Sequence, residues 1–471
     1  MAPNKDLSRL SSRRHLHLRA DKAKLSDLFR VLSNRDIESQ DLDFIDGIRE
    51  KSTTFKRRGI IFLSILAQKY FHYVSKPLSW FGSTFEFCLN LVSHNKSFCT
   101  TLFRALQGTL EMPDEEDSSY VSFIGYLDKR VDLGRFKPRD KKYFGALCAV
   151  ASKVSYENKA FIQSVVQHRW EMDFLGAYDF WNEYQQTLST QGFMFHDKSS
   201  DPDMIFVVFR GTEPFNAEDW RTDFDLSWYE FASMGRVHGG FMKALGLQKG
   251  ETWPTEIQED DPQRPVAYYF LRQKLREIML KKSNSRTRFI LTGHSLGGAL
   301  AVLFAAVLAL HGEESILERL EAVYTFGQPR VGDEGFRGFM EEQLRVYGVR
   351  YYRFVYSHDI VPRLPIDDAA MMFKHFGTCL YYNCLFQGQV VEEEPLKNYF
   401  SLREFVTKRV DALWEIVRGF LLPGIYGAEY KEGWILKGCR LFGLIIPGFP
   451  AHAPQEYINS IQLGEVDGLF Y

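Results

Sequence analysis

The chain is poor in cysteine: it has six among 471 residues, and they show no paired metal-ligand spacing. They are scattered as Cys88, Cys99, Cys148, Cys379, Cys384 and Cys439. Such sparse usage excludes a disulfide framework and predicts reduced thiols, as in a cytosolic environment. A bridge between Cys379 and Cys384 is the alternative.

An excess of positive charge is also missing, because 58 Lys and Arg stand against 60 Asp and Glu and the formal net charge is -2. Binding to phosphates depends on a face rich in Lys and Arg, so no nucleic acid partner is expected. Residues 1–24 are basic and polar and lack the apolar core of a secretory signal, so secretion is not expected. Their Arg and Ser content leaves a transit peptide as the alternative.

The sequence has no clean apolar run of the roughly 20 residues that a membrane-spanning helix needs. Residues 59–92 are the most aromatic and apolar segment, but three polar residues interrupt it: Gln68, Lys69 and Glu86. Pro77 is expected to break this segment into two helical arms. With the basic residues 56–58 just ahead, the segment predicts a hairpin or amphipathic pair lying in a lipid interface. A helical pair packed on the rest of the chain is the alternative.

The overall composition, 45% hydrophobic and 25% charged, is that of a globular protein. An acidic stretch at 114–117 and a basic, proline-containing stretch at 137–142 predict a loose boundary near residue 135. Residues 1–135 would then form a basic and apolar helical region that is expected to associate with a lipid surface, and residues 136–471 a second domain. In the second domain helices and buried strands alternate, which predicts an α/β fold with a mostly parallel sheet flanked by helices. The predicted helices are 143–155, 265–282 and the one after Ser295, and the predicted strands are 204–209, 289–291, 322–326 and 351–355.

The motif GHSLG at 293–297 lies between a predicted buried strand and a predicted buried helix. A reactive serine sits on such a turn with an unfavourable backbone angle, and glycines two places on either side let strand and helix approach. Ser295 is therefore the predicted nucleophile. A serine hydroxyl needs a histidine base and a carboxylate that orients it, and in α/β hydrolases these follow in the order Ser, Asp, His.

Asp359 is the predicted acid, because it follows the strand 351–355 at its carboxyl end. The rivals in turn-like or helical settings are Asp333, Asp367, Asp368 and Asp411. His452 is the predicted base, in a proline-bracketed loop after the apolar run 444–446, which is expected to be the last strand. His375 is its rival. His311 is expected to end a helix, and His358 to point away from the site.

The oxyanion of ester attack needs two hydrogen-bond donors. The backbone N–H of Leu296 is one, and Thr212, directly after the strand 204–209, is predicted to supply the other. Residues 216–224 predict a short amphipathic helix capped by Asn216. We expect it to act as a lid through Phe215, Trp220 and Phe224; a purely structural helix is the alternative.

Together these segments resemble the class 3 lipases, the family of fungal triacylglycerol lipases and their plant relatives. The matching motifs are VFRGT at 208–212, VHGGF at 237–241, TGHSLGG at 292–298, TFGQPRVG at 325–332 and HDIVPRLP at 358–365. The resemblance covers roughly residues 140–460. It implies an α/β-hydrolase fold, a triad of Ser295, Asp359 and His452, an oxyanion hole at Thr212 and Leu296, and a lid around Trp220.

The amino-terminal region, the helix from Ala146 and an insert at about 366–445 look more narrowly like the plant oil-body lipases. This resemblance implies hydrolysis of acylglycerols, chiefly triacylglycerol, at the cytosolic surface of lipid droplets, without a metal or cofactor. Two alternatives remain open at this point. One is a phospholipase or galactolipase A1 that acts on membrane lipids, and the other is a non-catalytic droplet-binding or tethering protein.

Overall fold

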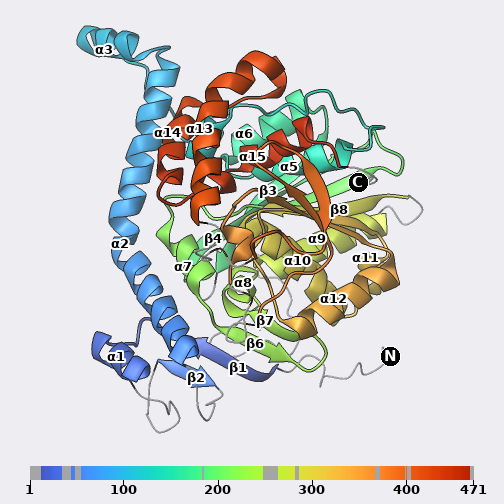
Figure 1. The fold of residues 1–471 in the computed structure, drawn as a ribbon. Helices are drawn as coiled ribbons and strands as arrows, with labels where there is room; N and C mark the ends of the chain where they lie inside the picture. Colours follow the sequence, from blue (N-terminus) through green and yellow to red (C-terminus); the bar gives the residue numbers. More distant parts are fainter. Residues whose placement is uncertain are drawn as a thin grey trace.

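A sheet of eight strands forms the centre of the molecule in the computed structural model (Figure 1). The structure describes residues 12–33, 44–47, 55–182, 185–247, 264–281, 286–365, 367, 372–397, 399 and 405–466. The strand order is β12-β11-β10-β9-β8-β5-β4-β3. The bounds are β3 (Asp173–Asn182), β4 (Thr187–Asp197), β5 (Met204–Phe209), β8 (Arg288–His294), β9 (Leu320–Phe326), β10 (Arg350–Tyr356), β11 (Thr378–Tyr382) and β12 (Gly388–Val391).

The middle of this sheet is parallel and its two edges are antiparallel. The strands β5, β8, β9, β10 and β11 run parallel to their neighbours in that group. At the edges, β3 and β4 pair antiparallel with each other, β4 with β5, and β12 with β11. The predicted mostly parallel sheet is therefore confirmed, and the predicted strands 204–209, 289–291, 322–326 and 351–355 lie within β5, β8, β9 and β10.

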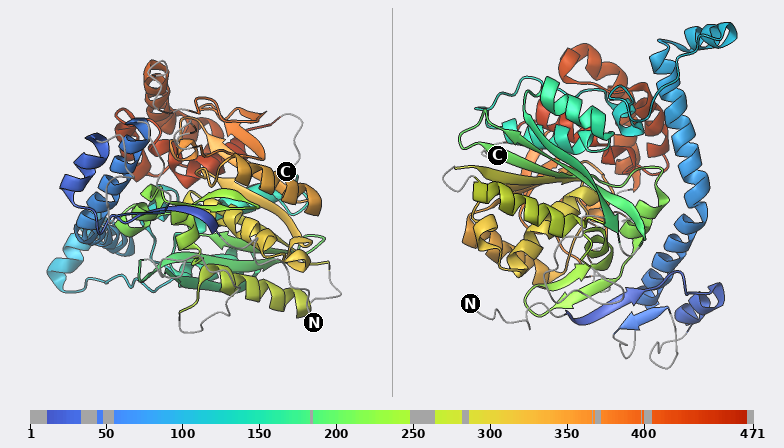
Figure 2. Two further views of the ribbon diagram at one scale, coloured as in Figure 1. Left: turned by 90° about the horizontal axis from the view of Figure 1, so that it is seen from below. Right: turned by 180° about the vertical axis from the view of Figure 1, so that it is seen from behind.

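Helices cover both faces of the sheet, as the predicted α/β fold requires (Figures 1 and 2). One apolar core lies beneath α8 (Gly239–Ala244), α9 (Ala267–Lys281), α10 (Leu296–Leu310), α11 (Glu314–Leu317) and α12 (Glu334–Tyr347). The other lies beneath α5 (Tyr143–Val154), α6 (Lys159–Ser164), η2 (Val165–Arg169) and α15 (Pro454–Leu463). Thirteen of the fifteen residues of α10 are buried, which confirms the predicted buried helix.

The amino-terminal part is joined to the rest by a small second sheet of order β2-β1-β6-β7. Its strands are β1 (Ser12–Leu18), β2 (Ile45–Gly47), β6 (Trp228–Phe231) and β7 (Gly235–His238). The helices of this part are α1 (Leu25–Ser33), α2 (Phe55–His94), α3 (Phe98–Gln107) and α4 (Phe123–Leu127). Arg130 ties the segment after α4 to α15, since its guanidinium donates to Asn459 Oδ1 at 2.5 Å. The boundary near residue 135 stays a prediction.

The predicted break at Pro77 is wrong, because α2 is one helix of 40 residues with Pro77 inside it. Figure 1 shows it as a single helix that changes direction along its length. A proline removes one backbone hydrogen bond from a helix, so other contacts must stabilise the helix if it continues through the proline. Those contacts lie on both sides of Pro77: Phe71 stacks on Phe224, and Phe81 packs on Phe215. Within the described part of the chain, no helix is both long and apolar enough to span a bilayer.

The insert before His452 is mainly helical, with α13 (Phe405–Tyr426), η5 (Gly427–Glu429), α14 (Trp434–Gly443) and η6 (Pro450–His452). The strand expected at 444–446 is absent from the observed structure, where these residues form turns after α14. Ile445 and Ile446 are exposed, and in the described part of the chain these residues belong to neither sheet. All six cysteines, including Cys379 and Cys384, are free.

Candidate active site

Ser295 lies at a tight turn between β8 and α10, where its backbone has φ 57° and ψ -130°. This is the unfavourable angle predicted for the motif, and such a residue costs about 1–3 kcal/mol. The flanking glycines explain how the turn closes. A Cβ on Gly293 would collide with the backbone of Gly297, and one on Gly297 would collide with the carbonyl of Phe209. The turn therefore holds Ser295 at the carboxyl end of the sheet.

The structure brings Ser295, His452 and Asp359 together in one hydrogen-bonded row. His452 Nε2 lies 2.8 Å from Ser295 Oγ, and His452 Nδ1 lies 2.8 Å from Asp359 Oδ2. Asp359 follows β10 and is fully buried, whereas His452 ends η6. The imidazole can thus accept a proton from the hydroxyl while the carboxylate fixes its tautomer.

The carboxylate of Asp359 is held by neighbours that the sequence did not single out. The Tyr457 hydroxyl donates to Oδ2, and the backbone N–H of Val361 donates to Oδ1 at 2.9 Å. Burial raises the pKa of Tyr457 well above its ordinary value, so this hydroxyl stays a donor. Tyr457 lies five residues after His452, at the start of α15. Tyr457 and Asp359 lie 98 residues apart in the sequence, so no local sequence pattern reveals this hydrogen bond.

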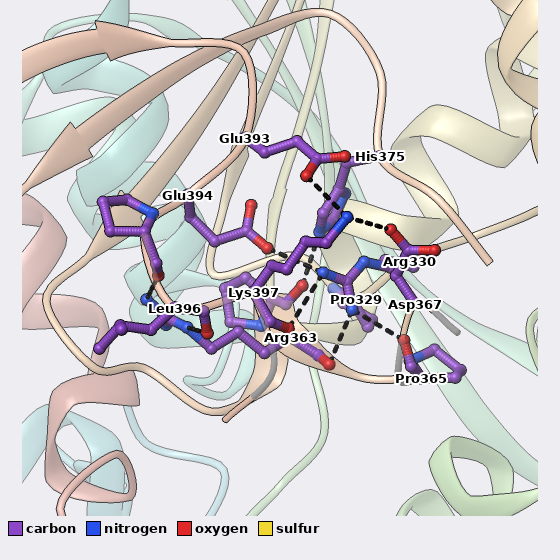
Figure 3. A network of polar contacts seen from close by, with 12 residues as sticks. Pro329, Arg330, Arg363, Pro365, Asp367, His375, Glu393, Glu394, Leu396 and Lys397 are labelled. Carbon is purple, nitrogen blue, oxygen red and sulfur yellow. Dashed lines mark hydrogen bonds and ion pairs between the residues drawn. The ribbon is translucent and has the colours of Figure 1, made fainter. Parts of the chain in front are cut away.

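Two buried arginines fix the loop after Asp359 (Figure 3). Arg363 donates to the carbonyl oxygens of Ser357 at 2.9 Å and Pro395 at 2.7 Å, and also to that of Asp359 itself. Arg330 donates to the carbonyl of Arg363 at 2.8 Å and pairs with Glu394 at 3.0 Å. The loop therefore presents Asp359 on a rigid support.

His294, directly before the nucleophile, holds the backbone of His452. Its Nε2 donates to the His452 carbonyl at 2.8 Å, and its Nδ1 accepts from the Tyr156 hydroxyl at 2.8 Å. Burial lowers the pKa of His294 well below its ordinary value, so the ring is neutral and can do both. Sequence reasoning missed His294 and Tyr156, because it sought histidines only after Ser295.

Thr212 lines the same cavity as Ser295, and Leu296 directly follows Ser295. Thr212 follows β5, and Leu296 is the first residue of α10. The two segments approach closely: a Cβ on Gly211 would lie 3.1 Å from the Cβ of Ser295. The Thr212 hydroxyl donates to Asp223 Oδ2 at 2.7 Å, which fixes its rotamer. Burial raises the pKa of Asp223 to about 7, against the lowering effect of this hydrogen bond.

The predicted short helix is confirmed as α7 (Ala217–Phe224), with Asn216 accepting from two backbone N–H groups of its first turn. Of the three predicted lid residues, Trp220 lines the cavity beside Ser295. Phe224 stacks on Phe71 of α2, with ring centroids 5.4 Å apart. The rings around Phe215 come from α2 and α4: Phe81, Phe85 and Phe123. In this structure α2 therefore covers part of the apolar side of α7.

The other histidines after the nucleophile have different partners. His375 Nε2 donates to the Pro362 carbonyl at 2.6 Å. His358 Nε2 lies 2.7 Å from Asp411 Oδ2, which also accounts for that rival carboxylate. His311 follows the last residue of α10, as expected. None of these three contacts Ser295.

The rival carboxylates have structural partners. Asp333 caps α12 by accepting from the N–H of Phe336 at 3.0 Å. Asp367 pairs with Lys397 at 2.9 Å. Asp368 lies outside the described residues. Among the residues that the structure describes, no three His, Cys, Asp or Glu side chains are grouped to hold a metal ion.

A small apolar cavity of about 90 Å³ opens beside Ser295 and His452. Its walls come from α7, α14 and η6, through Trp220, Leu436 and Pro450. Phe449, which is half exposed, lies at its edge. The cavity can thus receive an apolar group next to the hydroxyl.

A strained serine at a strand-to-helix turn, bonded to a histidine and a buried aspartate on a mostly parallel sheet, defines a serine hydrolase of the α/β-hydrolase class. Comparison with known proteins specifies the family. Residues 206–369 match the family described as Lipase (class 3). The chain is 38% identical to "Triacylglycerol lipase OBL1" of Arabidopsis thaliana, over 96% of this chain and 95% of that protein.

Two further plant relatives are similar. "Triacylglycerol lipase OBL1" of Nicotiana tabacum is 38% identical over 87% of this chain and 84% of that protein. The protein of the same name from Ricinus communis is 34% identical over 98% and 96%. The chain therefore belongs to the class 3 lipases and is a serine carboxylic ester hydrolase.

Proposed function

We propose that this chain hydrolyses triacylglycerol at the surface of lipid droplets, with Ser295 as nucleophile, His452 as acid and base, and Asp359 as the residue that orients His452. The observation that carries the proposal is the row of two 2.8 Å contacts from Ser295 through His452 to Asp359 beside an apolar cavity. The substrate class is supported by the names of the plant relatives, which match 87–98% of the chain.

The reaction follows from this geometry. Ser295 Oγ attacks the ester carbonyl while its proton passes to His452 Nε2. The N–H groups of Leu296 and Thr212 hold the negative oxygen, and His452 returns the proton to the leaving glycerol oxygen. Water then attacks the acyl group on Ser295. His452 takes a proton from this water and returns one to Ser295 Oγ as the fatty acid leaves. These steps need no metal or organic cofactor.

Association with the cytosolic side of a lipid droplet is part of the proposal. Exposed apolar and aromatic side chains of α2 support it, among them Leu63, Tyr73 and Trp80. The α7 helix, with Trp220 over the cavity, is the proposed lid. Because α2 packs on α7, contact between α2 and lipid would move α7 and change how far it covers the cavity.

The test compares wild type with Ser295→Ala on emulsified triolein, measured as fatty acid released. If the three residues act as a unit, the variant loses about four to six orders of magnitude in turnover. Asp411→Asn, whose carboxylate lies beside His358 rather than His452, is the matched control and should stay near the wild-type rate. An unchanged rate in Ser295→Ala rejects the mechanism. Faster release from phospholipid or galactolipid vesicles than from triolein rejects the substrate class.

A further inference from the structure

The helix α13 has its charged residues inside and its apolar residues outside, the reverse of an ordinary surface helix. The exposed side chains fall on one side of the helix: Val406, Val410, Leu413, Val417, Phe420, Leu421 and Ile425. The buried positions on the opposite side include Lys408, Glu415 and Arg418. A helix that only completed a soluble domain would show the opposite distribution.

The neighbouring α14 and the turns after it follow the same arrangement. Arg440 is buried, whereas Trp434 is 78% exposed and Phe442 is 65% exposed. The turns add Ile445 and Ile446 to the exposed set. We call the outward apolar side chains of α13, α14 and residues 444–449 the insert face.

A buried ion network holds the charged sides of α13 and α14 against the protein, so that the insert face is exposed. Arg418 pairs with Glu456 at 2.6 Å, and Arg440 bridges Glu415 at 3.1 Å and Glu432 at 2.5 Å. Glu456 also accepts from Arg440 and belongs to α15, which starts two residues after His452. Charged side chains can be buried when they are paired and hydrogen-bonded in this way. Ion pairs thus connect α13 and α14 to the hydrolase core, together with a few apolar contacts such as those of Leu422 and Leu436.

The insert face is continuous with the Ser295 cavity. Phe449 belongs to both, and Leu436 and Cys439 of α14 line the cavity from within. In Figures 1 and 2, α13 and α14 lie on the side of the molecule where α2 runs. An apolar ligand on this face would therefore meet the entrance to the cavity directly.

The side chains at the edge of the face suit a lipid surface. Lys437 Nζ lies 4.7 Å from the ring centroids of both Phe420 and Trp434. Trp and Lys are enriched at membrane interfaces, where the ring lies at the headgroup level and the ammonium reaches water. Exposed apolar patches of this kind mark interaction sites.

We propose that the insert face docks on the surface of a lipid droplet and places the entrance of the Ser295 cavity against the oil, as a contact separate from α2. This inference rests on the proposed function, because the occupant is the acylglycerol phase that the cavity would receive. The ion network holds the two helices in place while their apolar side chains enter the lipid.

The test measures flotation with triolein droplets coated with phosphatidylcholine, using the full chain with Ser295→Ala so that binding is read without hydrolysis. The test variant carries Val410→Ser, Ile425→Ser and Phe442→Ser. The matched control carries Leu188→Ser, Leu280→Ser and Val346→Ser, which are equally exposed but lie on β4, α9 and α12. Both should melt within about 2 °C of the parent, because exposed side chains contribute little to folding.

We expect the test variant to partition to droplets at least about tenfold more weakly, while the control binds like the parent. Equal binding by all three proteins overturns the inference and leaves the droplet contact to α2. A parent that dimerises without lipid through this face, with unchanged droplet binding in the test variant, also overturns it. Neither outcome depends on turnover, so each is separate from failure of the Ser295 mechanism.

A second measurement locates the face in the lipid. Brominated phosphatidylcholine quenches tryptophan fluorescence when the ring enters the acyl region. Adding Trp434→Phe to the Ser295→Ala protein should remove part of the quenching, whereas Trp181→Phe, on β3, should leave it unchanged. Equal quenching in Trp434→Phe and the parent contradicts the insertion of α14.

Discussion

The helices α10 and α13 are both rich in apolar residues, yet they use them in opposite ways. In α10 nearly every side chain is buried between the sheet and α8, and the helix holds Ser295 at its first turn. In α13 the apolar side chains face solvent, and Arg418 and Glu415 face the core. The difference shows that apolar content does not by itself decide which side of a helix is buried. Paired charges can hold a helix to a core as apolar contacts do.

The largest expected effect comes from breaking the charge network under α13. Arg440→Met leaves Glu415, Glu432 and Glu456 without this guanidinium, so the free energy of unfolding should fall by about 3–5 kcal/mol. Urea unfolding measures it. Arg345→Met is the control, because Arg345 forms an exposed pair with Glu342 and should cost less than about 1 kcal/mol. Equal costs would show that the buried network does not hold the insert.

Truncating one leucine in each helix sharpens the comparison. Leu303→Ala in α10 removes a fully buried side chain and should lower the free energy of unfolding by about 2–5 kcal/mol. Leu413→Ala in α13 removes an exposed side chain and should change it by less than about 0.5 kcal/mol. Thermal unfolding in the absence of lipid measures both. A large loss at Leu413 would place the outer side of α13 against protein.

A smaller effect separates two buried carboxylates, Glu456 and Asp223. Burial would raise the pKa of Glu456, but Arg418 and Arg440 outweigh it and hold that pKa below its ordinary value. No guanidinium lowers the pKa of Asp223 in the same way. Burial raises that pKa to about 7, although Thr212 and His452 act to lower it. Its protonated form is thus favoured by folding. The stabilisation is complete below about pH 4 and is lost as the pH rises through about 7.

We therefore expect α7 to open more readily at pH 8 than at pH 5, by about tenfold in hydrogen exchange after correction for the intrinsic rate. Asp223→Asn should weaken this pH dependence. The rest is assigned to Asp219 of the same helix, whose pKa burial raises to about 8, so adding Asp219→Asn should abolish it. The same pH dependence in wild type and both variants would assign it to another group.

Local patterns predicted much of the fold, because strands such as β5 and β8 and the turn at Ser295 depend on neighbouring residues. The same reasoning failed at Pro77, where contacts of Phe71 and Phe81 with distant residues outweigh the missing hydrogen bond. It failed again at residues 444–446, because an apolar run has the same composition whether it forms a strand or an exposed turn. Tyr457 was missed because its partner Asp359 lies 98 residues away in sequence, and His294 because histidines were sought only after Ser295.

The sequence by itself determined the strand-to-helix turn at Ser295, the alternation of helices and strands and the family to which the chain belongs. These depend on side-chain size and backbone freedom over a few residues. Only the tertiary structure decided how His452 reaches Ser295 across 157 residues and which side of α13 faces the core. The reason is physical: burial and ion pairing are set by distant partners, and one pattern of apolar and charged residues permits either side to be buried until those partners are in place.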